Sequence, residues 1–142
     1  MKITKSLLLK VLLVIGGAIQ IIYWGLSHIL FPEWYLQSVG LVDLSRNPGS
    51  TTVFLNEIGV LTIGTGVASI LAAVNPIGNI YIIIMLYING IGSILVSLYN
   101  IIIGKMTSGE WTTIIIISIQ MILLTILYPW KELKRKYVKT IK

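Results

Sequence analysis

Polar side chains within long apolar segments are the residues of this sequence that could do chemistry. Glu57 is the only acidic residue well inside one of the expected membrane spans, roughly two helical turns from the start of that span, whereas Glu110 falls in the first turn of the fourth. The other polar candidates in such segments are Gln20, His28, Asn89 and Asn100. Because an ionisable group in hydrocarbon is costly, it is a candidate functional residue by default. Glu57 is therefore the centre of the predicted polar site.

Two interpretations of Glu57 follow from its position. In the functional one, the carboxylate carries a proton or binds a cation, as in small proton-coupled exporters or at a quinone site. In the structural one, it hydrogen-bonds to Asn56, His28 or Tyr23 and holds the outer end of the helices together.

The neutral polar residues have a simpler expected role. We expect Gln20, Asn89 and Asn100 to hydrogen-bond between helices, at about 0.5–2 kcal/mol each. His28 is the single histidine, and we expect it to hydrogen-bond near the outer interface.

Several kinds of chemistry are excluded by composition. The absence of cysteine excludes disulfides, thiolate nucleophiles and iron–sulfur clusters. A single histidine cannot supply paired haem ligands, and no Glu-x-x-His pair for a di-iron site is present. No hydrolase elbow, phosphate loop or metalloprotease motif appears either. We therefore expect no catalytic residue, no metal site and no cofactor of the chain's own, and we keep a quinone open as a bound molecule.

Composition also indicates the medium around these residues. Hydrophobic residues make up 56% of the 142 residues and charged residues only 11%, so we expect lipid as the solvent. The net charge of +6 does not indicate nucleic acid, because the basic residues flank the apolar segments, where they meet headgroups and cytoplasm. They are Lys2, Lys5 and Lys10 at the start, and Lys131, Lys134, Arg135, Lys136, Lys139 and Lys142 at the end.

Four apolar segments are long enough to cross a bilayer, which takes about 20 residues of helix. We expect spans at residues 6–31, 51–74, 77–103 and 109–130, within one domain that covers residues 1–142. Backbone groups in hydrocarbon must satisfy one another, and these segments lack the alternation of barrel strands. The sequence therefore predicts an all-α, integral membrane four-helix bundle.

The connections and the tail predict how this bundle is oriented. A proline, an acid and two aromatics open the connection at 32–49 and indicate a short helix along the interface between spans 1 and 2. Basic residues at both ends, including the tail at 131–142, predict that both termini are cytoplasmic. We therefore expect a multi-pass protein of the cell (cytoplasmic) membrane, with the turn at 75–79 inside and the turn at 105–109 outside.

Small residues predict where helices pack closely. Gly64 and Ala68 have the small-xxx-small spacing that allows close approach, and Ala72 continues the same side of span 2 as Glu57. This side is the predicted packing face of span 2.

Short motifs in spans 2 and 3 resemble a known group of membrane proteins. They are Asn56-Glu57-Ile58-Gly59-Val60-Leu61, Ala72-Ala73-Val74-Asn75-Pro76 and Asn89-Gly90-Ile91. They are similar to the small four-span BphX-like proteins, which are loosely akin to the DoxX-like group. The resemblance implies four spans with a tight inside turn. Some DoxX-like proteins are linked to quinone-coupled sulfur oxidation, which implies a quinone near the outer face.

Three functions are compatible with these features. We favour a non-catalytic accessory subunit of a larger membrane complex, of the respiratory oxidase or membrane monooxygenase type, with lipid and other membrane subunits as partners. One alternative is a binder of a small hydrophobic ligand or a proton-coupled carrier, centred on Glu57 with Gln20 and Asn89. The other is a quinone-linked membrane oxidoreductase component.

Overall fold

The computed structural model describes residues 4–38, 48–104 and 110–133, and all regular structure there is helical. Both the all-α prediction and the expected number of apolar spans are confirmed for these residues. The turn at 105–109 and the tail beyond residue 133 lie outside them. Four helices are long and apolar enough to cross a membrane: Lys5–Leu30, Thr52–Ala72, Ile80–Ile102 and Glu110–Leu127.

The first span is one continuous helix made of three parts. α1 (Lys5–Ile19) passes into a π-helical segment, η1 (Gln20–Gly25), and then into α2 (Leu26–Leu30). The Thr4 hydroxyl caps its start by accepting a hydrogen bond from the Leu7 N–H at 3.3 Å. π-helical turns are rare and are frequently found at functional sites. Nothing in the apolar pattern of the sequence predicts this segment.

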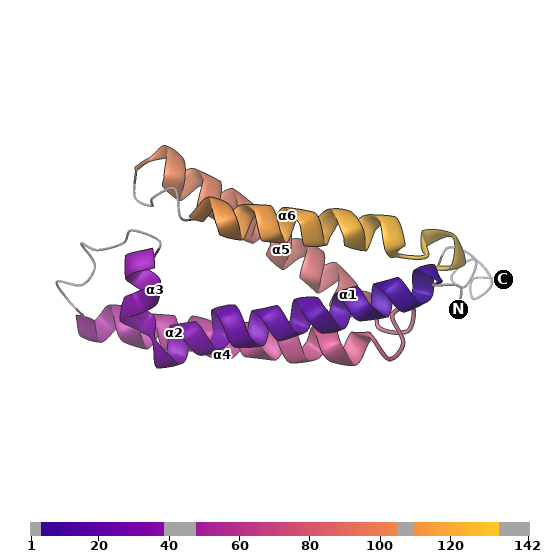
Figure 1. Cartoon of the computed structure of the whole chain (residues 1–142), viewed down its shortest axis with the longest axis horizontal. Coiled ribbons are helices and arrows are strands. Elements are labelled where there is room, and N and C mark those ends of the chain that lie inside the picture. Colours follow the sequence, from indigo (N-terminus) through magenta and orange to yellow (C-terminus); the bar gives the residue numbers. More distant parts are fainter. Residues whose placement is uncertain (1–3, 39–47, 105–109, 134–142) are drawn as a thin grey trace.

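A short helix, α3 (Pro32–Ser38), follows the first span directly, as the sequence predicts. Its first residue is a proline, whose fixed φ suits the first turn and whose missing N–H is not needed there. Glu33 sits favourably near the positive end of the helix. Phe31 has left the helical region, with φ −136° and ψ 50°, as expected for a residue that precedes proline. α3 therefore turns away from the axis of the first span (Figure 1).

The reversal between the second and third spans is longer than the sequence suggests. α4 (Pro48–Ala72) ends before a turn at 73–79, in which the Asn75 side-chain oxygen accepts a hydrogen bond from the Gly78 N–H at 3.0 Å. This turn uses residues that we assigned to the third span. α5 (Ile80–Ile102) therefore begins at residue 80 instead of residue 77.

The last span also ends earlier than expected. α6 (Glu110–Leu127) stops two residues before Pro129, which has no N–H to continue the helical hydrogen bonds. The Trp130 indole N–H instead donates to the Thr125 carbonyl at 3.0 Å. A side chain thus satisfies the carbonyl that the proline leaves without its usual donor.

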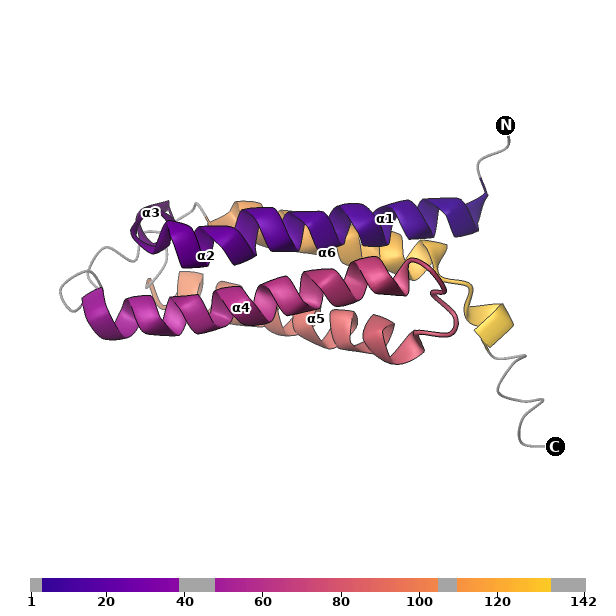
Figure 2. The ribbon, with the colours of Figure 1, turned by 90° about the horizontal axis from the view of Figure 1, so that it is seen from below.

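Glycine pairs bring the first span and α4 into backbone contact. All three parts of the first span contact α4, and the two helices lie side by side in Figures 1 and 2. A Cβ atom on Gly66 would lie 2.7 Å from the Gly17 carbonyl oxygen, and one on Gly59 would lie 2.9 Å from the Gly25 carbonyl oxygen. Any larger residue at these positions forces the backbones apart, so glycine is required here for packing.

The structure separates the three residues of the predicted packing face of α4, Gly64, Ala68 and Ala72. Gly64 is exposed and has open space around its Cα, and Ala68 is half-buried. Ala72 is fully buried, and the neighbouring Ser69 donates a buried hydrogen bond to the Leu13 carbonyl at 2.9 Å. Within the chain, the close approach comes from Gly59 and Gly66 instead of Gly64.

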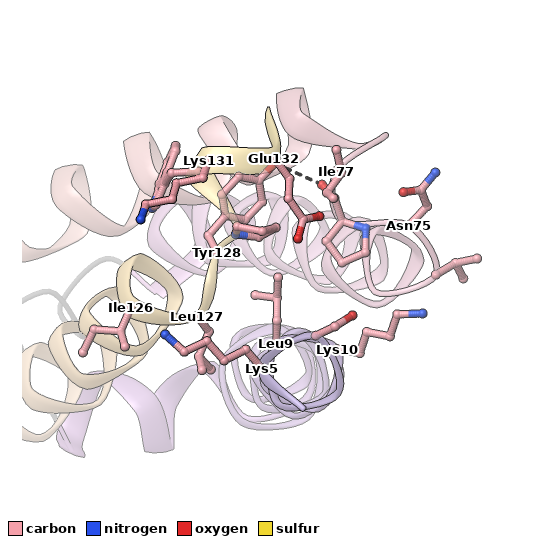
Figure 3. Close-up of a pocket in the computed structure, with 15 residues that line it drawn as sticks. Lys5, Leu9, Lys10, Asn75, Ile77, Ile126, Leu127, Tyr128, Lys131 and Glu132 are labelled. Carbon is pink, nitrogen blue, oxygen red and sulfur yellow. Dashed lines mark hydrogen bonds between the residues drawn. The ribbon is translucent and has the colours of Figure 1, made fainter. Parts of the chain in front are cut away.

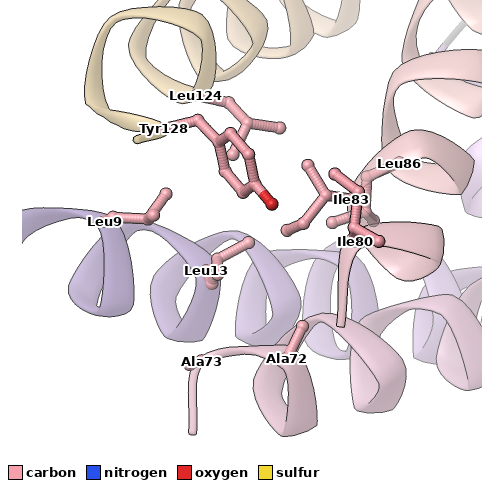
Figure 4. Close-up of a cluster of buried hydrophobic side chains, with 9 residues drawn as sticks. All are labelled: Leu9, Leu13, Ala72, Ala73, Ile80, Ile83, Leu86, Leu124 and Tyr128. Atoms are coloured by element: carbon pink, nitrogen blue, oxygen red, sulfur yellow. The ribbon is translucent and has the colours of Figure 1, made fainter. Parts of the chain in front are cut away.

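The apolar core joins all four spans at one end of the molecule. Its members come from the start of α1, the end of α4, the start of α5 and the end of α6 (Figure 4). The Tyr128 hydroxyl also reaches the Pro76 carbonyl, at 3.3 Å. The remaining inter-helix contacts pair α5 with α6 and with α4, α6 with α1, and α3 with α2 and with α4. The core residues are Leu9, Leu13, Ala72, Ala73, Ile80, Ile83, Leu86, Leu124 and Tyr128.

The glycine contact predicts a difference between two alanine substitutions in α4. We expect Gly66→Ala to lower the free energy of unfolding by about 1–3 kcal/mol, because the added methyl collides with the Gly17 backbone. Gly64→Ala gains the same helix propensity and meets open space, so it is the matched control. Reversible SDS-induced unfolding in mixed micelles measures both. Equal stability of the two variants would contradict the predicted contact.

Candidate functional site

Four polar side chains from four helices gather at the end of the molecule opposite the apolar core. They are His28 on α2, Tyr35 on α3, Ser97 on α5 and Glu110, the first residue of α6. Ser97 hydrogen-bonds to Glu110, and the rings of His28 and Tyr35 pack together. The charge of Glu110 acts on the Tyr35 hydroxyl and so connects the two pairs. We call these four residues the outer polar cluster, where outer means the end of the molecule away from the apolar core.

Glu110 is the buried acid of this cluster. Glu110 is only 3% exposed, and its Oε1 accepts a hydrogen bond from the Ser97 hydroxyl at 2.8 Å. The second oxygen, Oε2, is buried without a hydrogen-bond donor among the described residues. Its place in the first turn of α6 is favourable for a carboxylate, because the free N–H groups and the positive end of the helix dipole lie there. A carboxyl group so placed can hold a proton or accept one further donor.

His28 and Tyr35 form the other half of the cluster. His28 is 5% exposed, and its Nδ1–H donates to the Trp24 carbonyl, which also accepts from the Ser27 hydroxyl at 3.0 Å. The carbonyl can only accept, so the hydrogen bond places a proton on Nδ1, and in the neutral imidazole Nε2 is then an acceptor. The His28 and Tyr35 rings pack with their centroids 4.0 Å apart. Burial raises the pKa of the Tyr35 hydroxyl, and the negative charge of Glu110 raises it further.

Glu57, which we predicted as the centre of the site, lies elsewhere. It is exposed on α4, and it makes none of the three hydrogen bonds considered for it, to Asn56, His28 or Tyr23. The Asn56 side-chain oxygen is instead buried without a donor among the described residues. His28 is the one member of the predicted polar site that belongs to the outer polar cluster.

The three amide residues of the predicted site do not meet one another. Gln20 lies on η1 against Gly66, and its side-chain oxygen is buried without a donor among the described residues. Asn89 is exposed and Asn100 is half-buried, both on α5. Instead, the Gln120 side chain of α6 lies so close to the first span that a Cβ atom on Gly16 would sit 2.2 Å from its amide nitrogen.

Three residues of the cluster, Tyr35, Ser97 and Glu110, were not identified from the sequence as part of a site, and Tyr35 was expected only as an aromatic of the interfacial helix. Ser97 belongs to a polar stripe on α5 that also contains Asn89, Ser93 and Asn100. Glu110 begins an apolar span and has an adequate local role there as a first-turn acid. The signal that could have connected them is that both fall near the loop between α5 and α6, at the same end of two consecutive helices.

Comparison with known proteins identifies the family of the chain. The sequence model of DUF6790, described as a family of unknown function, matches residues 2–136. The chain belongs to the DUF6790 family. Comparison of this DUF6790 member with curated proteins and with solved structures finds no match. Its resemblance to the BphX-like and DoxX-like groups remains a prediction. Among its described residues, no three histidine, aspartate or glutamate side chains are grouped so as to hold a metal ion.

The cluster predicts a position-dependent effect of serine truncation in α5. We expect Ser97→Ala to lower the free energy of unfolding by about 1–3 kcal/mol, because the buried carboxyl of Glu110 loses the hydrogen bond from the Ser97 hydroxyl. Ser93→Ala, one turn away and exposed, should change it by less than about 0.5 kcal/mol. SDS-induced unfolding of both variants measures this. The effect of Ser97→Ala should also shrink in a Glu110→Ala background, and a cost that persists there would show that the hydrogen bond is not its cause.

Proposed function

We propose that this DUF6790 member is a non-catalytic accessory subunit of a larger complex in the cell (cytoplasmic) membrane, of the respiratory oxidase or membrane monooxygenase type. In this proposal the four spans form a bundle with both termini in the cytoplasm, and α3 lies along the outer interface. The observation that carries the proposal is the exposure of polar and small residues on the outer faces of α4 and α5. Lipid cannot satisfy such groups, whereas a helix of another subunit can.

The exposed face of α5 supports a partner helix most directly. Asn89 and Ser93 are both exposed and stand one turn apart, so their side chains project from the same face. Gly92, beside them, has open space around its Cα. An amide, a hydroxyl and a glycine together provide hydrogen-bonding groups and room for a close backbone approach, which is the composition of helix–helix contacts in membranes.

α4 carries a second exposed face of the same kind. Glu57 and Gly64 lie about two turns apart on its outer side, with the exposed Leu61 between them. An exposed carboxylate within an apolar span is costly in lipid, and an oppositely charged or hydrogen-bonding group on a neighbouring subunit would offset that cost. This gives Glu57 a role in contacting a partner.

The distribution of charged and aromatic residues supports the proposed orientation. Lys5, Lys10 and Lys131 lie at the end of the molecule that holds the apolar core, whereas Glu33 belongs to α3 at the opposite end (Figure 1). Basic residues favour the cytoplasmic side. Trp34 on α3 is 53% exposed, and an exposed indole suits the headgroup region at the outer interface.

The subunit proposal predicts a specific crosslink. We expect a photoreactive benzophenone amino acid in place of Ser93 to capture a larger membrane protein in native membranes, because this face of α5 contacts a partner helix. The matched control is the same substitution at Ile122, which is exposed on α6 among apolar residues and should crosslink mainly to lipid. Mass spectrometry of the adducts identifies the partner. An adduct of two copies of this chain, or none, would contradict the accessory-subunit role.

The proposed orientation is tested by thiol labelling, because the chain contains no cysteine and each introduced thiol is unique. Gln37 on α3 and Lys131 after α6 are both exposed. We expect a Gln37→Cys variant to react with a membrane-impermeant maleimide in intact cells, and a Lys131→Cys variant to react only after permeabilisation. The reverse pattern would place both termini outside.

A further inference from the structure

A cavity of about 630 Å³ opens at the end of the molecule where the apolar core lies. It is bounded by the start of α1, by the turn between α4 and α5, and by the residues that follow α6 (Figure 3). Segments from the two ends of the sequence and from its middle therefore form one space, and neither the predicted polar site nor the outer polar cluster includes any part of it.

The walls and the rim of this cavity differ in chemistry. Leu9 and Tyr128, both part of the apolar core, supply apolar walls together with Leu127. The charged lining residues are Lys5, Lys10, Lys131 and Glu132, so the lysines exceed the single acid by two positive charges. An occupant that matches both parts has an apolar portion and a negatively charged head.

The position of the cavity along the spans narrows the choice of occupant. α1 begins at Lys5 and α6 ends at Leu127, so the cavity lies where the spans end. Trp130, which also lines it, is 44% exposed, and an indole there is typical of the boundary between hydrocarbon and headgroups. At this depth a phosphate headgroup reaches the lysines while its glycerol and acyl chains remain beside the apolar helices.

We propose that this cavity binds the headgroup of an anionic phospholipid from the cytoplasmic leaflet. The positive charges of Lys5, Lys10 and Lys131, which lie on different sides of the space (Figure 3), attract the phosphate. Glu132 projects toward the same space (Figure 3) and can accept a hydrogen bond from a hydroxyl of the lipid head. The inference rests on the spans and the orientation in the proposed function and does not require a partner subunit.

The direct test uses native mass spectrometry of the full chain, purified from nanodiscs that contain equal parts phosphatidylglycerol and phosphatidylcholine. We expect phosphatidylglycerol to be retained selectively. Replacing Lys5, Lys10 and Lys131 by glutamine should weaken its retention by about fivefold for each lysine removed. The corresponding three arginine substitutions should preserve it, because they keep the charge. Equal retention of the two lipids by the unmodified chain would overturn the proposal.

A second pair of variants separates the cavity from general surface charge. Val74 and Leu71 are both exposed near the end of α4, but only Val74 lines the cavity. We expect Val74→Trp to fill the cavity and abolish selective retention with all lysines present, and Leu71→Trp to leave retention unchanged. Similar retention by the two tryptophan variants would show that the charge acts without the cavity.

A soluble competitor distinguishes a lipid head from a free phosphate. We expect glycerol phosphate, even in large excess, to displace bound phosphatidylglycerol poorly, because it lacks the acyl chains that keep the lipid at this depth. Efficient displacement would instead assign the cavity to a soluble phosphate compound. Crosslinking at position 93 and thiol labelling at position 37 are independent readouts, so failure of the subunit role and failure of the lipid site give different results.

Discussion

The backbone contact between the first span and α4 is the constraint on which the rest of the structure depends. At two glycine pairs, Gly17 with Gly66 and Gly25 with Gly59, the helices are closer than side chains would allow. The second pair lies beside His28, because a Cβ on Gly59 would sit 3.1 Å from the His28 Cβ. The contact therefore determines where the end of the first span lies and, through the short connection, where α3 begins.

Polar groups in this fold are separated by position along the spans and by the side of the helix they occupy. The buried ones are concentrated at the outer end, where His28, Tyr35, Ser97 and Glu110 come together from four helices. The exposed polar residues within the spans include Glu57 on α4 and Asn89 and Ser93 on α5. In a protein surrounded only by lipid, an amide and a carboxylate on the lipid-facing surface are costly, because hydrocarbon offers them no hydrogen-bond partner. This contrast is the physical basis of the subunit proposal.

Much of the fold could be predicted from the sequence because hydrocarbon leaves an apolar chain few alternatives to helix. Proline and glycine also mark the start of α3 and the end of α5, where Gly104 adopts a φ of 69°. The packing face of α4 could not be predicted in the same way. Glycines occur on two of its sides, and in a helix that is apolar all round, periodicity does not distinguish the face toward a neighbouring helix from the face toward lipid.

The candidate site was harder to predict, for a related reason. Glu57 is predicted as a site residue because it lies within an apolar segment. Its depth along the span, however, does not determine whether its side chain faces inward. Glu110 has an ordinary explanation as an acid in the first turn of a helix, and only the tertiary arrangement shows that Ser97 donates to it in a buried position. The π-helical segment likewise has no sequence signature of its own here. The burial of Glu110 and the exposure of Glu57 depend on how the helices contact one another, which the pattern within a single helix does not determine.

The one-sided placement of the apolar core has a mechanical consequence. The apolar core joins all four helices at one end. At the other end the glycine contact holds the first span to α4, and only a few polar interactions connect this pair to α5 and α6, so that end is the less rigid one. A thinner bilayer or a docking neighbour would therefore deform the molecule mainly at the end away from the apolar core. The helix ends there would move apart or together while the core end keeps its arrangement. The end that carries Glu110 is therefore the one whose structure responds to the membrane or to a partner.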